Sequence, residues 1–423
     1  MPRTIHQRIF RVHRIYTIAV EFAWAALKVV AAFHPKIKRF VTGRANLFRS
    51  LERAISPEDR IIWMHVASLG EFEQGLPILE QLGTAYPDHK RLITFFSPSG
   101  FEVKKNTSSA EIVAYLPMDT SKNASLFLDI AHPELAIFVK YEVWPNYLRA
   151  LSQRRIPTVL VSAVFHKKKI YFKPYGGFMR KALRRFDHIF VQDLTSKKLL
   201  ESLAIKKVTL NGDTRFDRVS QILEQDNTLD FMEFFSRDRF CLVAGSTWPE
   251  DERILVAHIN STPQRICHVL APHNIKREHI LALKETIRKN VVLYSEISPL
   301  EGLSDKEVLI VDTIGLLTKI YRYADTAYVG GGFSTGLHNT LEPAVFGIPV
   351  LIGPKYSGFK EAEDLVEQGG IRVVETQRQY NEKIERFVTD AVYRQEIGQI
   401  NASYVSEKVG ASVQIMAYLR TLL

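Results

Sequence analysis

The feature that most constrains the fold is a regular alternation of short apolar runs, rich in β-branched residues, with helix-like segments from about residue 60 onward. Such alternation is typical of a parallel sheet covered by helices on both faces. A polar, weakly patterned stretch at residues 221–239 interrupts it, and 423 residues are many for one hydrophobic core. The sequence therefore predicts two doubly wound α/β domains joined near residue 225, followed by C-terminal helices. We expect the strands at residues 61–66, 92–96, 112–116, 135–139, 158–161, 188–191, 208–210, 240–244, 266–270, 291–294, 308–311, 326–329 and 349–352.

Common phosphate-binding motifs are absent from the sequence. No Gly-x-x-x-x-Gly-Lys-Ser/Thr run occurs, which excludes the usual P-loop nucleoside triphosphatase, and the glycines at 330–332 lack the spacing of a dinucleotide fingerprint. The chain also has no Asp-x-Asp pair to hold a metal ion against a sugar diphosphate. Ligands of doubly wound sheets bind beyond the carboxyl ends of the strands. With two such domains, we expect the active site in the cleft between them.

Charge and cysteine content narrow the partners and the compartment. The formal net charge of +10 favours an anionic partner, which can be a nucleotide, an acidic lipid or a nucleic acid. The two cysteines, Cys241 and Cys267, each lie in an apolar strand-like run. We therefore expect buried, reduced thiols in a cytosolic protein rather than a disulfide framework. No Cys/His spacing resembles a structural zinc site.

The first 50 residues predict an amphipathic helix. Their apolar stretch at 15–33 is close to the length that spans a bilayer, but charged side chains interrupt it. These charges recur every seven residues and form one narrow stripe: Arg14, Glu21 and Lys28. Such a helix can lie in a membrane interface beside acidic headgroups, or it can pack on the body of the protein. We expect residues 1–50 to form a membrane-associating segment, and whether it spans the membrane or lies on it stays open.

Two carboxylates follow predicted strands in the first domain. Glu71 opens a helix after the strand at 61–66, where it could take a proton from an attacking hydroxyl or could merely complement the helix dipole. Glu142 follows the buried strand at 135–139, and a nearby Lys or Arg could simply pair with it. Two carboxylates at the strand ends of one sheet indicate acid–base chemistry more strongly than either carboxylate alone.

Glycine-rich turns follow predicted strands in the second domain. The turn Gly245-Ser246-Thr247 could hold a phosphate through backbone N–H groups. Further on, the glycines at 330–332 would let a ligand approach the backbone closely, and Asn339 and Glu342 fall one turn apart at a helix start. Glu342 could accept hydrogen bonds from both hydroxyls of a ribose. The alternatives are a glycine-rich turn and a helix cap with no ligand.

Six short motifs occur one after another along the chain. They are Ser68-Leu69-Gly70-Glu71, the Tyr-Glu-Val-Trp-Pro-Asn run at 141–146, Gly212-Asp213-Thr214-Arg215-Phe216-Asp217, Gly245-Ser246-Thr247, Asp312-Thr313-Ile314-Gly315 and His338-Asn339-Thr340-Leu341-Glu342-Pro343. Each motif is weak alone, but six in register are specific. In this order they resemble the bacterial 3-deoxy-D-manno-octulosonic acid (Kdo) transferases of lipopolysaccharide assembly, and the resemblance covers nearly the whole chain.

The resemblance implies a GT-B fold, in which two Rossmann-like domains face each other across a cleft. The acceptor domain would span residues 51–225, and the donor domain residues 226–423. The implied donor is CMP-Kdo, and the implied acceptor is the phosphorylated disaccharide precursor of lipid A at the cytoplasmic face of the bacterial inner membrane. The reaction would invert the anomeric centre and would need neither a cofactor nor a metal ion.

The resemblance also assigns roles to individual residues. Glu71 becomes the general base, and Glu142 and Arg215 match positions that stabilise the transition state. The nucleotide turn Gly245-Ser246-Thr247 and Gly332 belong to the donor side. The matching CMP contacts are Pro272, His273, Ile314, Gly315, Leu316, Asn339, Thr340, Leu341 and Glu342.

The chain departs from the family pattern at three donor-side or catalytic positions. Arg215 stands where the family usually has Lys, which keeps the charge but changes its geometry. The run Pro272-His273-Asn274 replaces a Pro-Arg-His motif, and Leu316 stands where the family often has Glu. These changes affect the details of donor binding more than the class of reaction.

Competing interpretations remain for partners and function. A basic, aromatic-rich stretch at 166–185 could meet acceptor phosphates or the membrane surface, or it could be a solvated helix face. No recognisable nucleic-acid-binding module accompanies it, so we expect no nucleic-acid partner. Two other functions stay open: a GT-B transferase that uses another nucleotide sugar, and a non-catalytic, membrane-bound GT-B module that binds lipid.

Overall fold

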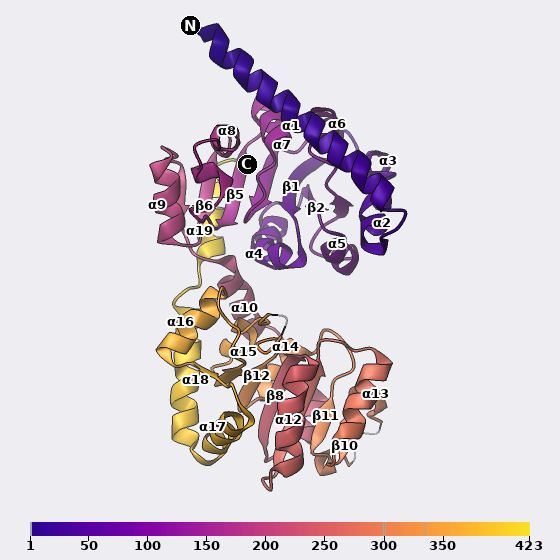
Figure 1. Cartoon of the computed structure of the whole chain (residues 1–423), viewed down its shortest axis with the longest axis vertical. Helices are drawn as coiled ribbons and strands as arrows, with labels where there is room; N and C mark the ends of the chain where they lie inside the picture. The colour runs from indigo at the N-terminus through magenta and orange to yellow at the C-terminus, as the bar shows by residue number, and fades with distance from the viewer. Residues whose placement is uncertain (1, 299, 301, 335) are drawn as a thin grey trace. The chain divides into compact units, whose positions relative to one another are not determined.

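The computed structural model describes residues 2–298, 300, 302–334 and 336–423, and it divides into two compact units. The first unit consists of Met1–Arg218 and Gly410–Leu423, and the second consists of Val219–Val409. Each unit contains one seven-stranded sheet with helices on both faces (Figure 1). The predicted α/β class and the predicted two sheets are therefore confirmed.

The first sheet is entirely parallel and has the strand order β3-β2-β1-β4-β5-β6-β7. Its chain starts at β1, continues outward to β3, and then returns to β4 on the other side of β1. The direction of strand order therefore reverses between β1 and β4, which is the switch point where doubly wound sheets bind ligands. The strands are β1 (Arg60–Val66), β2 (His89–Phe95), β3 (Ile112–Tyr115), β4 (Leu135–Val139), β5 (Thr158–Ala163), β6 (His188–Val191) and β7 (Val208–Leu210).

Helices cover both faces of the first sheet, because its central strands are apolar on both sides. Helix α4 lies directly on β1 and β4: a Cβ atom at Gly75 would come within 2.6 Å of Met64 Sδ. Proline begins α5 and α7, where its missing N–H costs nothing. The helices after the N-terminal segment are α4 (Leu69–Ala85), α5 (Pro98–Lys104), α6 (Ser121–Ala131), α7 (Pro145–Arg154), α8 (Gly177–Leu183), α9 (Leu194–Ser202) and α10 (Thr214–Glu224).

Three helices precede β1: α1 (Pro2–Val30), α2 (Pro35–Thr42) and α3 (Leu47–Ala54). One face of α1 packs against the rest of the first unit, where Tyr16 Oη donates to Asp119 Oδ2 at 2.8 Å and Trp24 packs against Phe40. The opposite face of α1 leaves large apolar side chains exposed, such as Phe22 at 77%. The helix thus packs on the body and keeps an exposed apolar face. Across the described residues, no helix is both long enough and apolar enough to cross a membrane.

The second sheet is also parallel, with the order β10-β11-β9-β8-β12-β13-β14. All thirteen predicted strands are present, and the sequence missed β14. As predicted, Cys241 and Cys267 are buried and form no disulfide bond. They lie opposite each other on the paired strands β8 and β9. The strands are β8 (Phe240–Thr247), β9 (Ile266–Pro272), β10 (Val291–Leu293), β11 (Val308–Ile310), β12 (Thr326–Val329), β13 (Val350–Ile352) and β14 (Ile371–Val373).

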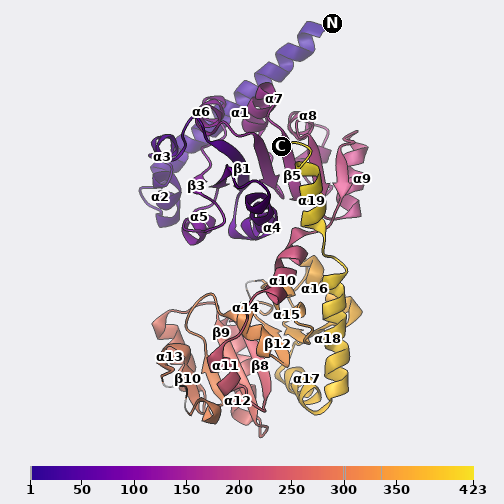
Figure 2. The ribbon, with the colours of Figure 1, turned by 180° about the vertical axis from the view of Figure 1, so that it is seen from behind.

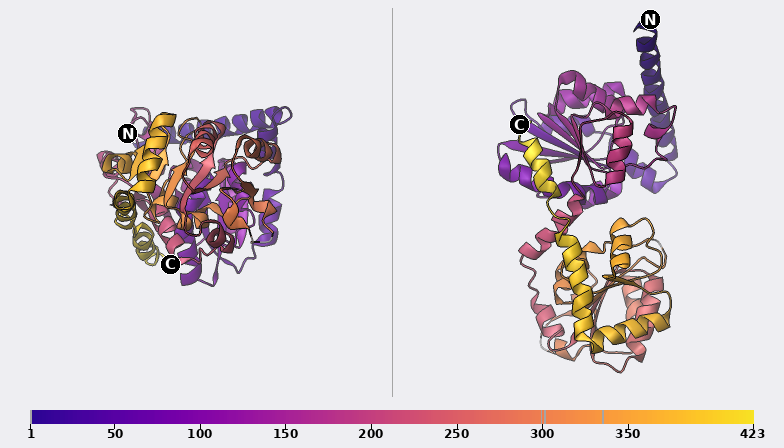
Figure 3. Two further views of the ribbon diagram at one scale, coloured as in Figure 1. Left: turned by 90° about the horizontal axis from the view of Figure 1, so that it is seen from below. Right: turned by 90° about the vertical axis from the view of Figure 1, so that its left-hand side faces the viewer.

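Helices surround this second sheet as well (Figure 3, right). Helix α12 begins at Pro249, and the Asp251 carboxylate caps it by accepting from the Trp248 N–H at 2.9 Å. Helix α16 ends at Gln368, and the next residue, Gly369, has the left-handed conformation that is common after a helix. The α-helices are α11 (Asp230–Phe235), α12 (Pro249–Ser261), α13 (Arg277–Thr286), α14 (Leu317–Ile320), α15 (Leu341–Ala344), α16 (Lys360–Gln368), α17 (Gln377–Thr389) and α18 (Ala391–Ser406).

The division of the chain differs from the predicted domains of 1–50, 51–225 and 226–423. The boundary lies at Arg218/Val219, inside α10, and residues 1–50 are part of the first unit. The C-terminal helix α19 (Ala411–Leu419) also belongs to the first unit (Figure 2). Helix α19 belongs to the first unit because its apolar side is buried in the core on the α4 face of the first sheet. Its buried apolar residues there are Ile415, Met416 and Leu419.

Candidate functional site

Two buried carboxylates lie at the carboxyl edge of the first sheet, on either side of its switch point. Glu71 follows β1 and Glu142 follows β4, and these two strands pair directly with each other. Their exposed fractions are 7% and 8%. Carboxylates are rarely this buried unless they are paired or functional. The structure therefore brings together the two carboxylates that the sequence placed at strand ends.

Glu71 lies in the first turn of α4, where its pKa is raised above the ordinary value. Its Oε2 accepts from the backbone N–H of Ala67 at 2.5 Å, so the side chain folds back over the turn after β1. Burial and, to a lesser extent, the neighbouring charge of Glu142 raise the pKa of Glu71 to about 7, although the Ala67 N–H and Lys140 oppose the shift. A carboxyl group that titrates near neutral pH can take up and release a proton under physiological conditions.

The Glu142 carboxylate lies against ring nitrogens of two aromatic side chains. Trp144 Nε1–H donates to its Oε2 at 2.7 Å, and His65 Nε2 lies 3.0 Å from the same oxygen. The turn that carries Glu142 begins with Lys140, whose φ of +64° is unusual for a residue with a side chain. Such conformations are kept where the surrounding structure demands them, often at functional sites.

Arg215 belongs to the first unit, at the start of α10. Its Nε donates to Asp213 Oδ2 at 2.8 Å, and its backbone N–H donates to Asp213 Oδ1 at 2.9 Å. Burial raises the pKa of Tyr141, Glu71 raises it further, and Arg215 lowers it. Tyr141, which directly precedes Glu142 in the chain, therefore lies near both Glu71 and Arg215.

The glycine-rich turns of the second unit meet at its own switch point, between β8 and β12. Ser246 has a φ of +55°, and the carboxylate of Asp251 joins the two turns by accepting from the N–H of Trp248 and of Gly331. Gly332 lies against the backbone of Gly353, where a Cβ atom would come within 2.7 Å of the Gly353 Cα. Gly245 similarly lies under the Tyr321 hydroxyl. Close packing thus explains these two glycines, and Thr247 is buried beside them.

The loop that leads into α15 presents polar groups at the same edge. Glu342 accepts from Asn339 Nδ2 at 3.0 Å and from Thr318 Oγ1 at 3.1 Å, while Asn339 Oδ1 accepts from the Leu341 N–H. The Thr340 hydroxyl is buried and has no hydrogen-bond partner among the described residues. This loop is therefore internally ordered, and one of its buried polar atoms is left unsatisfied.

The remaining predicted donor residues lie on two neighbouring loops. Pro272 ends β9, and His273 is exposed directly after it. After β11, Ile314 and Gly315 are exposed and Leu316 is half-buried. The His273 N–H donates to the Thr247 carbonyl at 2.9 Å, which ties the loop after β9 to the end of β8.

A stack of three rings, which the sequence did not reveal, lines this edge. Trp248 and His273 stack with ring centroids 4.5 Å apart, and His273 and His338 are 4.8 Å apart. Trp248 Nε1–H donates to His338 Nε2 at 3.0 Å, so the other ring nitrogen of His338 carries the hydrogen when the imidazole is neutral. Burial lowers the pKa of His338, and His273 lowers it further, which favours that neutral form. The sequence had singled out His273 as a CMP contact and His338 as part of the sixth motif, but it had not singled out Trp248.

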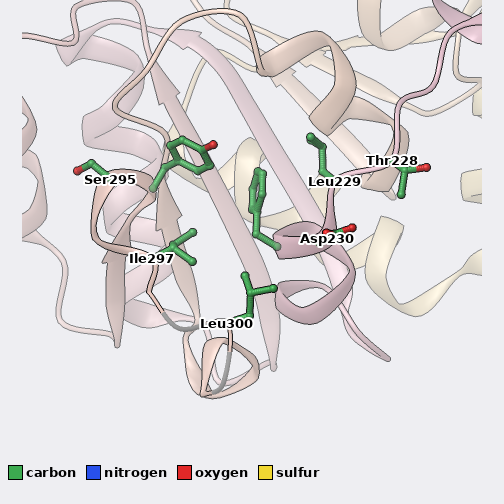
Figure 4. A pocket seen from close by; sticks show the side chains of 8 residues that line it. Thr228, Leu229, Asp230, Ser295, Ile297 and Leu300 are labelled. Atoms are coloured by element: carbon green, nitrogen blue, oxygen red, sulfur yellow. The ribbon is translucent and has the colours of Figure 1, made fainter.

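A cavity of about 600 Å³ lies elsewhere in the second unit, between the start of α11 and the turn after β10 (Figure 4). Phe231 and Tyr294 form its aromatic wall. None of the predicted donor residues lines it, although Ser295 bonds to Asp312 of the fifth motif. Among the residues described, no cluster of His, Cys, Asp and Glu side chains is arranged to hold a metal ion.

Two parallel, doubly wound sheets in one chain, each with candidate residues at its switch point, define a protein of the GT-B fold. The solved structure of UDP-GlcNAc 2-epimerase from Neisseria meningitidis matches with a TM-score of 0.61 and 15% identity, over 85% of this chain and 100% of that chain. MurG from Acinetobacter baumannii matches with a TM-score of 0.52 and 10% identity, over 86% and 99% of the two chains. At these identities the likeness establishes the fold alone.

Sequence relatives define the family. The model of the family described as 3-deoxy-D-manno-octulosonic-acid transferase (kdotransferase) matches residues 38–218. The 3-deoxy-D-manno-octulosonic acid transferase of Haemophilus influenzae is 28% identical over 92% of this chain and 93% of its own length. That of Aquifex aeolicus is 29% identical over 73% of this chain and 80% of its own length. The chain belongs to the Kdo transferase family.

Proposed function

We propose that this protein transfers Kdo from CMP-Kdo to the phosphorylated disaccharide precursor of lipid A, with inversion at the anomeric carbon. The observation that carries the proposal is the pair of buried carboxylates at the switch point of the first sheet, one of which titrates near neutral pH. Membership of the Kdo transferase family supplies the identity of the donor sugar.

The chemistry divides between Glu71, Glu142 and Arg215. Glu71 accepts the proton of the acceptor hydroxyl, whose oxygen forms the new bond to the anomeric carbon of Kdo. The bond from that carbon to the phosphate of CMP breaks, and CMP leaves with the bonding electron pair. The negative charge of Glu142 favours the cationic character of the sugar, and the guanidinium of Arg215 favours the developing negative charge. One base and no covalent intermediate give inversion.

Donor binding is assigned to the loops at the carboxyl edge of the second sheet. Glu342, which accepts hydrogen bonds from Asn339 and Thr318, is assigned the ribose hydroxyls. The unsatisfied hydroxyl of Thr340 offers one more polar contact. The remaining contacts come from the turn Gly245-Ser246-Thr247, from Gly332 and Leu341, and from the loops Pro272–His273 and Ile314-Gly315-Leu316, where the exposed backbone of Gly315 can approach a nucleotide closely.

The test is acceptor-dependent release of CMP. We expect turnover with CMP-Kdo and a tetraacylated lipid A precursor, and none with UDP- or GDP-sugars, because polar groups aimed at cytosine leave other bases unsatisfied. Transfer from a uridine or guanosine nucleotide would favour the alternative GT-B transferase. Binding of the lipid without turnover of any donor would favour a non-catalytic module.

We further propose that the first unit sits on the cytoplasmic face of the inner membrane through α1. Its exposed apolar side chains share the helix face opposite the packed one, and the charged stripe flanks them. Phe178 of α8 packs against Tyr16, which joins α1 to the basic stretch that holds the exposed Tyr175. An apolar face with basic flanks suits an interface of anionic lipid. The exposed apolar residues of this face are Ile15, Ile18, Phe22 and Val29, and Phe33 in the turn after α1 is exposed as well.

Vesicle binding should depend on this apolar face. Replacing both Ile18 and Phe22 by Glu removes two exposed apolar groups and adds negative charge, so we expect the affinity for vesicles with phosphatidylglycerol to fall by about tenfold or more. Sedimentation with vesicles measures it. Glu21→Gln, in the adjacent charged stripe, is the matched control and should bind as the parent does. Equal binding by the double variant and the parent would contradict the proposed membrane face.

A further inference from the structure

A chain of buried hydrogen bonds runs from the first sheet to Glu142. Trp63 Nε1–H donates to Thr94 Oγ1 at 2.8 Å, and Thr94 Oγ1 lies 2.9 Å from His65 Nδ1. On the other side of the ring, His65 Nε2 lies 3.0 Å from Glu142 Oε2, which also accepts from Trp144 Nε1–H. The side chains of Trp63, His65 and Thr94 are completely buried. Their contacts are therefore not shared with bulk solvent, and every donor needs an acceptor inside the protein.

The partners decide which nitrogen of His65 carries the hydrogen. A carboxylate oxygen can only accept, so the bond to Glu142 requires a hydrogen on Nε2. The Thr94 hydroxyl already accepts from Trp63, and its own hydrogen is available for the lone pair on His65 Nδ1. With this order, each donor in the series of hydrogen bonds has one acceptor.

A competing tautomer exists within the same pocket. His65 Nδ1 also lies 3.0 Å from the backbone carbonyl of Thr94, so a hydrogen on Nδ1 could bond to that oxygen. The lone pair would then sit on Nε2 and face the Glu142 carboxylate, and two acceptors in contact repel each other. The Thr94 hydroxyl, by donating to Nδ1, selects against this arrangement.

We propose that Thr94 and His65 are positioning residues of the site: Thr94 sets the Nε2–H tautomer, and His65 holds the charged carboxylate of Glu142 beside Glu71. This inference rests on the proposed function, because it assigns Glu142 a charge that the transfer reaction uses. Neither residue touches the reacting groups, and both act through Glu142.

The inference links the network to the basicity of Glu71. The charged groups that act on Glu71 are Glu142, which favours its protonated form, and Lys140, which favours its ionised form. Tyr171 also faces Glu142, and Tyr141 lies near both Glu71 and Arg215. If Glu142 turned away or took up a proton, Glu71 would lose the negative charge beside it and would ionise at lower pH.

The decisive variant is Thr94→Val, which removes the hydroxyl and keeps the shape of the side chain. We expect His65 to change from the Nε2–H to the Nδ1–H tautomer, which ¹⁵N chemical shifts of histidine-labelled, ligand-free protein report, with His65→Gln to assign the signal. In the transfer assay we expect kcat to fall about tenfold, because the charge of Glu142 is lost from the transition state. The acid limb of the pH profile should also move to lower pH, while KM for CMP-Kdo stays within about twofold.

Two matched variants separate this role from mere packing. Thr94→Ser keeps the hydroxyl, and Trp63→Phe removes the other hydrogen bond of Thr94 but leaves its bond to His65 intact. Both should keep the parent tautomer and the parent pH profile. Thermal unfolding of all three variants checks that each one is folded under the assay conditions.

Two results would overturn the inference: a Thr94→Val protein that keeps the Nε2–H tautomer, or one that changes tautomer while kcat and the acid limb stay those of the parent. Failure of the proposed function is distinguishable, because a parent protein without Kdo transfer would refute that function alone. In that case the tautomer of the ligand-free variants still decides whether Thr94 sets His65.

Discussion

Replacing Glu71 by Gln is expected to lower the rate of Kdo transfer by about 10²–10⁴-fold, the usual loss when a general base is removed. Gln keeps the size of the side chain but cannot accept the proton of the acceptor hydroxyl. Binding of CMP, which is assigned to the second unit, should stay as in the parent, and calorimetry can measure it. Glu80→Gln, further along the same helix α4, is the control and should be fully active. A Glu71→Gln protein with the parent kcat would refute the assignment of the base.

The pH dependence of the parent should follow from the same residue. Burial and Glu142 raise the pKa of Glu71 to about 7, and the active base is the ionised form. The logarithm of kcat/KM should therefore rise with a slope of one below pH 7 and level off above it. An acid limb near pH 4.5, the ordinary value for Glu, would mean that Glu71 is not the titrating base.

As the pH rises through the pKa of Glu71, the stability of the folded protein should fall while the activity rises. Because the folded-state pKa of Glu71 lies above its unfolded value, the folded protein holds this proton more tightly, and stability is lost as the pH rises from about 4.5 to about 7. Gln carries no charge at any pH. At pH 8, Glu71→Gln should therefore raise the free energy of unfolding of the first unit by about 2–3 kcal/mol, and urea denaturation can measure this change.

The fold could be predicted from the sequence because nearly every strand is buried on both faces. Strand β4, with all five residues buried, appears in the sequence as an uninterrupted apolar run. Strand β14 was missed because its middle residue is the charged Arg372. The edge strands β7 and β10 are equally short, but they contain only apolar or β-branched residues and therefore gave a clearer signal.

The candidate site could be predicted only in part, because the sequence does not show the register in which neighbouring strands pair. Glu71 and Glu142 are polar residues at the ends of apolar runs, so their positions stand out in the sequence, while their roles stay predictions. His65 and Thr94 lie inside strands and resemble ordinary core residues. Their contact arises because β1 and β2 pair with His65 opposite Thr94, and no local pattern in the sequence shows which residues become partners across a sheet.

The C-terminal helix was assigned to the wrong unit because an apolar helix face does not say which sheet it covers. Hydrogen bonds between segments that are distant in the sequence also attach the start of α19 to the first unit. Asn211 Nδ2 donates to the Ala411 carbonyl at 3.1 Å, and Asp217 accepts from the N–H groups of Gly410 and Ser412. These partners are separated by about 200 residues in the sequence, so only the folded structure connects them.

Truncation after Val409 should therefore prevent the first unit from folding, although it removes only the last 14 residues, Gly410–Leu423. The three large apolar side chains of α19 that join the core would be lost, and each buried Ile, Leu or Met contributes about 2–5 kcal/mol, so the sum approaches the whole stability of a typical domain. A graded version compares Ile415→Ala, in the core, with Val413→Ala, which is 62% exposed on the same helix. We expect Ile415→Ala to lower the free energy of unfolding by about 2–5 kcal/mol and Val413→Ala to change it by less than about 0.5 kcal/mol. Urea denaturation followed by circular dichroism measures both. Equal stability of the two variants would contradict the placement of α19 in the core of the first sheet, because only burial on that sheet makes Ile415 differ from Val413.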